Sequence, residues 1–274
     1  DLEPQLYSFQ TLRNFLELLK VHSEKTPFPV HIKLNTGMNR LGFDGENLPE
    51  LAEILKINSH LINVKSVFSH LAASDAEEFD HLSKNQIDEF LSHCKRIEDL
   101  GIKKFLKHIV NSNGIMRHPE AQLDMVRLGL GIYGLSSNEN FRKNLKPIAQ
   151  LKTTLSQVRK VTTGSGIGYS PKERLKDDKQ IGIIAIGYAD GIPRLLGNGN
   201  GFVFVNGRKA PFIGNICMDM SMIDISDIQC VEGDEVEIFG EHNSIYELAS
   251  AAQTIPYEIL TNVSNRVKRL FFRE

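Results

Sequence analysis

The first half of the chain alternates short apolar runs with amphipathic helical patterns, and this alternation restricts the fold more than any other feature. Leu12, Phe15, Leu16 and Leu19 follow the i, i+3, i+4, i+7 spacing of one helix face, after a possible cap at Ser8. Strands are expected at residues 5–7, 29–34, 64–68, 105–110 and 125–128. Alternating strands and helices imply parallel pairing with right-handed crossovers. The pattern predicts an α/β fold, an incomplete (β/α)8 barrel with about five of its eight strand–helix units.

Two helix starts in this half carry their own signals. Asn47 and Pro49 are expected to open one helix, because proline is favoured in a first helical turn. Ser83 and Gln86 have the spacing of a capping box, which predicts that another helix begins there.

The pattern changes after a polar stretch at residues 135–147, which predicts a boundary between a barrel domain at 1–142 and a second domain at 143–274. Residues 148–161 and 235–239 are expected to form strands. Asn206-Gly207 suits the type I′ turn of a hairpin. Ser244 and Glu247 are expected to cap a short helix. Regular strands with glycine turns predict a mainly antiparallel β domain.

Composition disfavours several classes of partner. A net charge of −2 gives no electrostatic reason to bind nucleic acid or an anionic membrane surface. No apolar run approaches the roughly 20 residues of a membrane span, and no signal peptide is expected. Three scattered cysteines favour reduced thiols over a disulfide framework or a zinc site. We therefore expect a cytoplasmic enzyme without a metal.

Polar residues gather at the expected C-terminal ends of the strands, where barrels carry their chemistry. Lys33 and Arg40 lie in or beside one apolar run, and a buried cation is costly unless an anion meets it. Ser112 and Gly129 follow two successive strands. A hydroxyl and free backbone N–H groups at strand-to-helix turns are donors that suit a phosphate.

Each of these residues also has an ordinary interpretation. Serine after a strand is commonly a helix cap, and a lysine at a strand edge can extend to solvent. An arginine such as Arg127 is commonly exposed or ion-paired, and a tyrosine such as Tyr169, after a glycine-rich loop, is commonly a packed or capping aromatic. The same reasoning makes His70 a core histidine, Met218 a core residue and Asp219 a turn residue.

Taken together, separated motifs resemble those of the alanine racemase family, in the family's order. They are His-Ile-Lys-Leu-Asn-Thr-Gly-Met-Asn-Arg-Leu-Gly-Phe at 31–43, Asn-Ser at 111–112, Met-Val-Arg-Leu-Gly-Leu-Gly-Ile-Tyr-Gly at 125–134, Gly-Tyr-Ala-Asp-Gly at 187–191, Gly-Asn-Ile-Cys-Met-Asp at 214–219 and Thr-Ile-Pro-Tyr-Glu at 254–258. The resemblance implies a pyridoxal 5′-phosphate enzyme. The family's cofactor lysine lies in a stretch similar to Val-Lys-Ala-Asn-Ala-Tyr-Gly, which these 274 residues do not contain.

The resemblance also implies the contacts of the cofactor. Ser112, Gly129 and Leu130 would hold its phosphate, together with Tyr257. Arg127 would face the pyridine nitrogen, which should stay unprotonated because an arginine is effectively always protonated. Arg40 would point to the phenolic oxygen.

Catalytic and substrate roles follow from the same resemblance. Tyr169 would be one of two bases, with His70 and Arg127 lowering its effective pKa. Lys33 resembles a lysine that is often carbamylated, a change that would replace a buried cation by an anion. The residues implied near the substrate and its access path are Tyr188, Met218 and Asp219.

The implied activity is the two-base interconversion of L-alanine and D-alanine, which supplies D-alanine for peptidoglycan. The implied assembly is a homodimer with an active site shared between subunits. The alternative is a non-catalytic dimerisation or cofactor-binding fragment of a longer polypeptide, such as a bifunctional ligase–racemase. A related pyridoxal phosphate-dependent decarboxylase is disfavoured, because neither its Gly-Gly-Gly loop nor its His…Cys-Asp pair is found.

Overall fold

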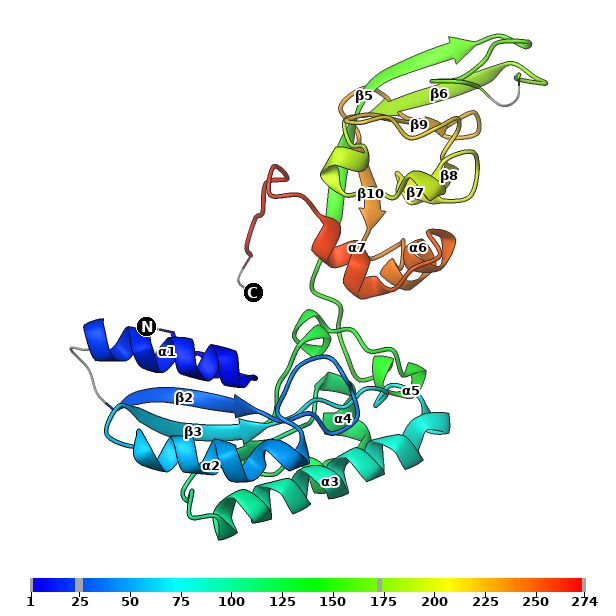
Figure 1. The fold of residues 1–274 in the computed structure, drawn as a ribbon. Helices are drawn as coiled ribbons and strands as arrows, with labels where there is room; N and C mark the ends of the chain where they lie inside the picture. The colour runs from blue at the N-terminus through cyan, green and yellow to red at the C-terminus, as the bar shows by residue number, and fades with distance from the viewer. Residues whose placement is uncertain (1, 23–26, 172–173, 273–274) are drawn as a thin grey trace. The chain divides into compact units, whose positions relative to one another are not determined.

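The computed structural model describes residues 2–22, 27–171 and 174–272. The chain forms two compact units, residues 1–147 and residues 148–274. Figure 1 traces them from blue at the N-terminus to red at the C-terminus.

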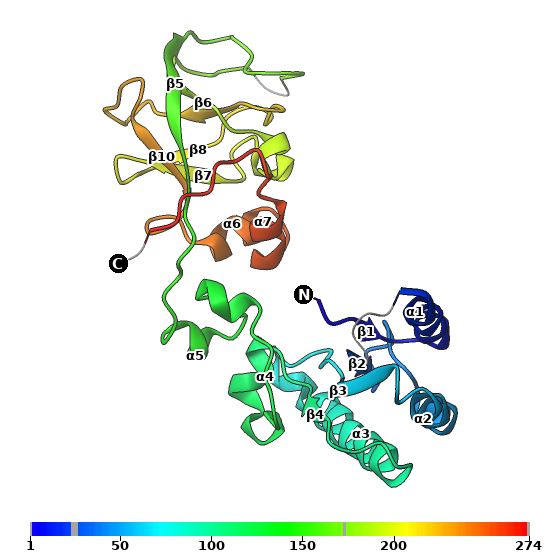
Figure 2. The ribbon, with the colours of Figure 1, turned by 90° about the vertical axis from the view of Figure 1, so that its left-hand side faces the viewer.

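The first unit is a parallel sheet with helices on one face. Its strands are β1 (Gln5–Leu6), β2 (Phe28–Lys33), β3 (Ile62–Phe68) and β4 (Leu106–His108), in the order β1-β2-β3-β4. The helices α1 (Phe9–His22), α2 (Leu48–Ile57) and α3 (Asp80–Asp99) follow one another along that face (Figure 2). The core between these helices and the sheet includes Leu12, Leu16, Val30, Ile32, Leu51, Ile87 and Phe90. The predicted parallel α/β arrangement is confirmed.

The predicted fifth strand at residues 125–128 is wrong, since the sheet of the described first unit has four strands. The segment runs beside β4 with only two backbone hydrogen bonds around it. Asp124 N donates to Lys107 O at 3.1 Å, and Arg127 N donates to Val110 O at 3.2 Å. It then turns at Gly129, where φ is −120° and ψ is −100°. The apolar pattern predicts a strand at this segment, but too few backbone hydrogen bonds form with the β4 segment to make it one.

The predicted capping box at Ser83 and Gln86 is also wrong. Helix α3 begins at Asp80, so Ser83 lies inside it, with a buried hydroxyl that has no partner among the described residues. Gln86 instead forms hydrogen bonds with the loop after β3. Its side chain accepts from Ala72 N at 2.9 Å and donates to His70 O at 3.2 Å. Gln86 therefore holds the loop after β3 in place and does not cap the start of α3.

Alternation along the strands gives the sheet a second, polar face. Val30 and Ile32 join the core under the helices, while His31 and Lys33 point the other way. The register places Lys33 beside Phe68 and Phe68 beside His108. One row of side chains thus crosses three strands at their C-terminal ends.

Shorter helices follow the last strand of the first unit. They are α4 (Ser112–Arg117) and α5 (Glu139–Arg142), with a 3-10 turn at Leu130–Tyr133 between them.

The second unit is a six-stranded antiparallel sheet in the order β8-β7-β10-β5-β6-β9. Its strands are β5 (Leu151–Val161), β6 (Lys179–Ile184), β7 (Phe202–Val205), β8 (Arg208–Pro211), β9 (Ser221–Asp224) and β10 (Glu235–Phe239). Asn206 and Gly207 turn the β7–β8 hairpin with φ of 50° and 72°, as a type I′ turn requires. Two helices follow, α6 (Ile245–Ala251), capped by Ser244, and α7 (Pro256–Asn262). The predicted antiparallel domain is confirmed.

Among the described helices, none combines the length and the apolar composition needed to cross a membrane.

Candidate active site

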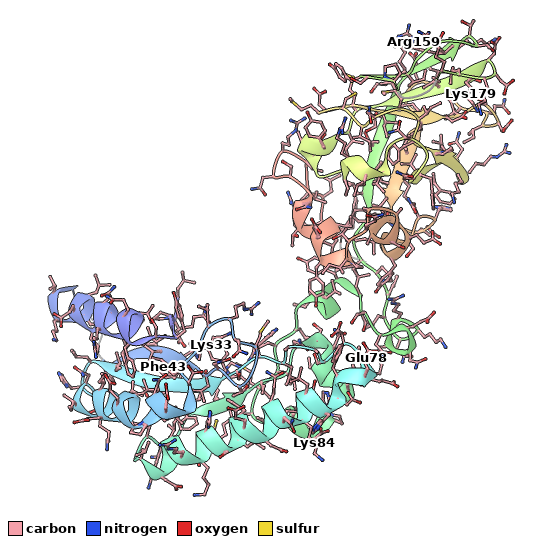
Figure 3. The ribbon with its side chains drawn as sticks, turned by 45° about the vertical axis from the view of Figure 1, so that its right-hand side comes forward. Lys33, Phe43, Glu78, Lys84, Arg159 and Lys179 are labelled. Carbon is pink, nitrogen blue, oxygen red and sulfur yellow. The ribbon has the colours of Figure 1, made fainter. Side chains whose placement is uncertain are left out.

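Three cations and a histidine lie at the C-terminal ends of the first unit's strands. This strand-end cluster consists of Lys33, Arg40, His70 and Arg127. Lys33, labelled in Figure 3, is 7% exposed, and its Nζ lies 5.3 Å from the centre of the Phe68 ring. The Arg127 Cζ lies 5.1 Å from the same ring centre. Within the described residues none of the three cations has an ion-pair partner, so the cluster is suited to anionic groups.

The cluster changes the ionisation of its own members. Burial, followed by Arg40 and Arg127, lowers the pKa of Lys33. Burial, followed by Arg127, Lys33 and Arg40, lowers the pKa of His70 to about 4. Burial lowers the pKa of Arg127 to about 10, which leaves it charged at neutral pH. His70 is therefore neutral at pH 7, and its bare ring nitrogen can accept a hydrogen bond.

Arg127 is fixed by hydrogen bonds to the ends of two strands. Its Nη2 donates to Ser69 O at 2.6 Å and to Ile109 O at 3.2 Å, and lies 3.4 Å from His70 Nδ1. Its Nη1 donates to His108 Nδ1 and, at 3.4 Å, to His108 O. The interpretation of Arg127 as an exposed arginine is thus wrong, because the fold holds its guanidinium at the strand ends.

His108 was not among the site residues predicted from the sequence. It is 3% exposed, and its ring stacks on Phe68 with centroids 5.0 Å apart and planes 5° apart. The available signal was a histidine inside the expected strand at 105–110, where alternation puts it on the face opposite Phe105 and Ile109.

Ser112 binds the backbone of the segment that replaces the fifth strand. Its Oγ accepts from Gly129 N at 2.8 Å and from Gly131 N at 3.2 Å, on either side of Leu130. The Leu130 side chain is buried, which fixes this backbone turn. A hydroxyl and two amides thus converge at the N-terminal turn of α4. The amides donate here to Ser112 Oγ, and together with the hydroxyl they are donors of the kind that bind a phosphate placed in that turn.

The ordinary interpretation of Ser112 as a helix cap is wrong, because Asn111 has that role. The Asn111 side chain accepts from Gly114 N at 3.0 Å and from Ser74 Oγ at 2.7 Å. The Ser112 hydroxyl therefore binds the backbone at Gly129 and Gly131 and does not cap α4.

In the second unit, backbone pairing brings Tyr188 beside the Met218–Asp219 segment. Tyr188 N donates to Cys217 O at 3.0 Å, and Ala189 N donates to Met218 O at 2.8 Å. At Gly187 an added Cβ would lie 2.4 Å from Cys217 O, so no side chain fits there. Met218, 57% exposed, is not a core residue, and Asp219 is also exposed.

Tyr169 is 73% exposed, so within its unit it is not a packed aromatic residue. Its backbone is held by Asn215, whose Nδ2 donates to Tyr169 O at 2.8 Å. The preceding Gly168 has φ of +68°, which places the tyrosine after a left-handed turn. Tyr257 lies in α7 and is 42% exposed. The roles of Tyr169 and Tyr257 beside residues of the first unit stay predictions.

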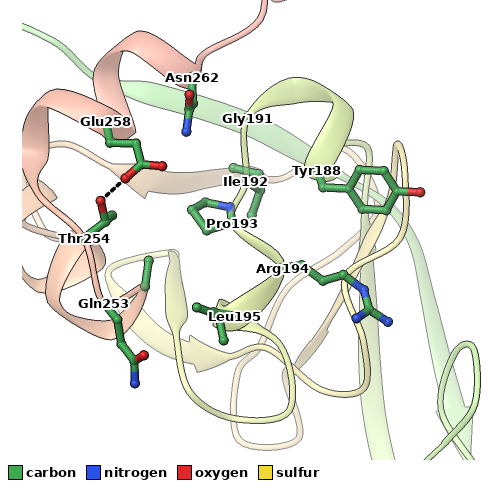
Figure 4. A pocket seen from close by; sticks show the side chains of 11 residues that line it. Tyr188, Gly191, Ile192, Pro193, Arg194, Leu195, Gln253, Thr254, Glu258 and Asn262 are labelled. Atoms are coloured by element: carbon green, nitrogen blue, oxygen red, sulfur yellow. Dashed lines mark hydrogen bonds between the residues drawn. The ribbon is translucent and has the colours of Figure 1, made fainter.

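A pocket of about 600 Å³ opens beside Tyr188 in the second unit (Figure 4). Its walls are the turn Gly191–Leu195 and residues of α7 and the loop before it, including Thr254, Glu258 and Asn262. Glu258 accepts a hydrogen bond from Thr254 across one wall.

Both units match models of one protein family. Residues 1–137 match the alanine racemase N-terminal domain, and residues 148–271 match the alanine racemase C-terminal domain.

Curated relatives agree with these matches. The chain is 37% identical over 251 residues to alanine racemase 2 of Caldanaerobacter subterraneus subsp. tengcongensis, covering 88% of this chain and 64% of that protein. It is 34% identical to the alanine racemase of Clostridium tetani, covering 100% of this chain and 72% of that one. The chain thus spans about two thirds of the length of these relatives.

Solved structures show the same similarity. Alanine racemase from Bacillus anthracis with bound L-Ala-P matches with a TM-score of 0.89 and 29% identity, over 98% of this chain and 70% of that one. Alanine racemase from Bartonella henselae with covalently bound pyridoxal phosphate matches with a TM-score of 0.84 and 30% identity, over 99% and 73%. The chain therefore belongs to the alanine racemase family, whose members are pyridoxal phosphate-dependent isomerases with an N-terminal barrel domain and an antiparallel β domain.

Proposed function

We propose that this chain takes part in the interconversion of L-alanine and D-alanine, as a pyridoxal phosphate-dependent racemase. The observation that supports this most directly is the pair of anion-binding features in the first unit. Ser112 converges with the amides of Gly129 and Gly131, and Arg127 is fixed at the neighbouring strand ends. A phosphate and a pyridine ring need these two kinds of partner.

The residues present fit pyridoxal 5′-phosphate. Ser112, Gly129 and Leu130 would hold the phosphate, with Tyr257 as a further contact. Arg127 would face the ring nitrogen, and Arg40 the phenolic oxygen. When bound, the cofactor stabilises negative charge at the substrate α-carbon. Because Arg127 stays protonated, its side chain would donate a hydrogen bond to the ring nitrogen and would transfer no proton to it.

The chain's own proton-transfer group would be Tyr169. A tyrosine has an ordinary pKa near 10, so it needs a neighbour that favours its ionised form before it can remove a proton. Arg127 bears a positive charge 3.4 Å from the neutral His70. A chain from Tyr169 through His70 to Arg127 would supply that stabilisation. The second base would be a cofactor lysine from the stretch that these 274 residues do not contain.

We further propose that Lys33 is carbamylated. Burial and the cations Arg40 and Arg127 lower its pKa. A lowered pKa increases the neutral amine, the form that reacts with CO₂. The product carries a negative charge, and it would offset Arg40 and Arg127 at a site where no carboxylate of the described residues pairs with them.

Substrate recognition would come from the second unit. Met218 would offer its backbone N–H to the substrate carboxylate, with Asp219 and Tyr188 beside it on the access path. Exposed Tyr169 and Met218 would complete the site of a second copy, in a two-fold dimer that acts in the cytoplasm and supplies D-alanine for peptidoglycan. The domain division at 142/143 is part of this proposal.

A second candidate role is a non-catalytic one, in cofactor binding and dimerisation. The observation that favours it is that these 274 residues contain no match to the family's cofactor-lysine stretch. The chain spans 64% and 72% of the length of two curated relatives.

Chiral chromatography of D-alanine formed from L-alanine tests the proposal, using the longest natural polypeptide that contains these residues. Replacing Tyr169 by Phe removes only the phenolic oxygen. We expect a fall in kcat of about 10²- to 10⁴-fold, the usual contribution of one acid–base group. Tyr246→Phe, in α6, is the matched control. Racemisation that is unaffected by Tyr169→Phe would refute the role of Tyr169, and the absence of racemisation would refute the activity.

A further inference from the structure

A hydrogen-bonded chain of side chains crosses the first unit's sheet and ends at Arg127. Glu3 Oε2 lies 2.9 Å from His31 Nε2. His31 Nδ1 lies 2.6 Å from Ser66 Oγ, and Ser66 Oγ lies 2.9 Å from His108 Nε2. His108 Nδ1 then contacts Arg127 Nη1. The proposed function above assigns no role to the first four residues.

The fold encloses the middle of this chain. Strand register sets His31 on β2 directly beside Ser66 on β3. Ser66 is 0% exposed and His108 is 3% exposed, so water does not replace their hydrogen bonds. The stack of His108 on Phe68 fixes the orientation of the imidazole ring. Each buried polar atom in the path is therefore satisfied by its neighbour in the path.

The proton positions at one end follow from Arg127. A guanidinium can only donate, so the His108 Nδ1 that it contacts must carry no proton. Burial, followed by Arg127 and His31, lowers the pKa of His108 to about 4, so this histidine is neutral at pH 7. A neutral imidazole without a proton on Nδ1 carries one on Nε2. His108 Nε2 therefore donates to Ser66 Oγ.

The positions at the other end follow from Glu3. An ionised carboxylate can only accept, so His31 Nε2 carries a proton and donates to Glu3. Ser66 Oγ already accepts from His108 Nε2, so the one hydrogen of its hydroxyl is donated to His31 Nδ1 at 2.6 Å, and that nitrogen carries no proton. The proton positions that Arg127 requires at one end agree with those that Glu3 requires at the other. Every hydrogen bond in the path is therefore donated in the direction from Arg127 toward Glu3.

We propose that Glu3, His31, Ser66 and His108 form a one-directional relay that positions Arg127. Hydrogen bonds that point the same way polarise one another, so the charge of Glu3 strengthens His108 Nδ1 as the acceptor for Arg127. The four residues act through Arg127 and do not touch a substrate. The consequence for a cofactor ring rests on the proposed function, whereas the direction of the hydrogen bonds does not.

The relay makes a spectroscopic prediction for the full chain without any ligand. Imidazole ¹⁵N NMR at pH 7 distinguishes the two neutral tautomers, because protonated and bare ring nitrogens resonate far apart. We expect both His31 and His108 to carry the proton on Nε2. A proton on Nδ1 of His108 would overturn the relay.

Variants at Glu3 test whether its charge and acceptor role reach His108. Glu3→Met removes the acceptor, and we expect mixed tautomers for His31 together with shifted nitrogen resonances for His108. Glu3→Gln keeps an acceptor oxygen and should preserve the tautomers. Glu17→Met removes another exposed carboxylate, which pairs with Lys20 in α1, and should change neither histidine. Unchanged His108 resonances in Glu3→Met would refute the coupling.

Ser66→Ala tests the positioning of Arg127 itself. Without the hydroxyl, the guanidinium should rotate faster about its Nε–Cζ bond, which the line shapes of its Nη resonances report. Ser69→Ala is the control, because it removes a buried hydroxyl at the same strand end but leaves the relay intact. Slow rotation that persists in Ser66→Ala would contradict the proposal. A normal relay in a protein that binds no pyridoxal phosphate would instead count only against the proposed function.

Discussion

Acid should destabilise the first unit through His108, which is buried and neutral beneath Arg127. Burial and then Arg127 lower its pKa from 6.5 to about 4. Between these two values the unfolded chain binds a proton that the folded chain does not, so the free energy of unfolding rises with pH through this window. The contribution is complete above pH 6.5 and is lost as pH falls toward 4. Between pH 7.5 and pH 4.5 the linkage relation gives a loss of about 2 to 3 kcal/mol.

Urea unfolding at the two pH values measures this loss, followed by far-UV circular dichroism because the chain has no tryptophan. The matched variant is His108→Gln, which does not titrate and keeps an N–H donor near Ser66. It should be less stable than the wild type at pH 7.5, and it should lose about 2 to 3 kcal/mol less on acidification. His70 titrates in both proteins, so its contribution cancels in the comparison. Equal losses of unfolding free energy in the two proteins, or a His108 pKa near 6.5 by NMR titration, would show that His108 is not the source of the acid sensitivity.

Two further substitutions test the anion site and the substrate segment. Ser112→Ala removes the acceptor that holds the Gly129 and Gly131 amides, and should weaken pyridoxal phosphate binding by about tenfold in calorimetry, whereas Ser112→Thr should not. Gly187→Ala would place a Cβ 2.4 Å from Cys217 O and should cost about 1–3 kcal/mol in thermal unfolding. Gly199→Ala meets nothing within 4 Å at φ of +81°, so only backbone strain of about 1 kcal/mol applies. Equal costs for the two alanines would contradict the close approach at Gly187.

The sequence was informative where one local signal determines one local structure. Apolar spacing located α1, and the Ser8 hydroxyl caps it by accepting from Thr11 N at 3.2 Å. Asn206-Gly207 predicted its turn because two residues with positive φ admit few sequences. The strand ends were predicted well enough to place Lys33 at the end of β2, and His70 and Ser112 after β3 and β4.

The misses share a physical cause, since each depends on contacts between segments distant in the sequence. Whether residues 125–128 form a strand depends on hydrogen bonds with β4, which apolarity does not determine. Ser83 and Gln86 have capping-box spacing, but Gln86 is used by the loop after β3. His108 acquires its role from Ser66 and Arg127, and no local pattern contains all three residues.

Equilibrium dialysis decides whether the strand ends of the first unit hold pyridoxal phosphate. The purified chain is dialysed against the cofactor, and the bound amount is determined from absorbance. Borohydride reduction and intact mass then show whether attachment is covalent. We expect saturable binding of one cofactor per chain, weakened in Ser112→Ala and competed by inorganic phosphate. No binding, or binding that Ser112→Ala and phosphate leave unchanged, would rule out a cofactor site at these strand ends.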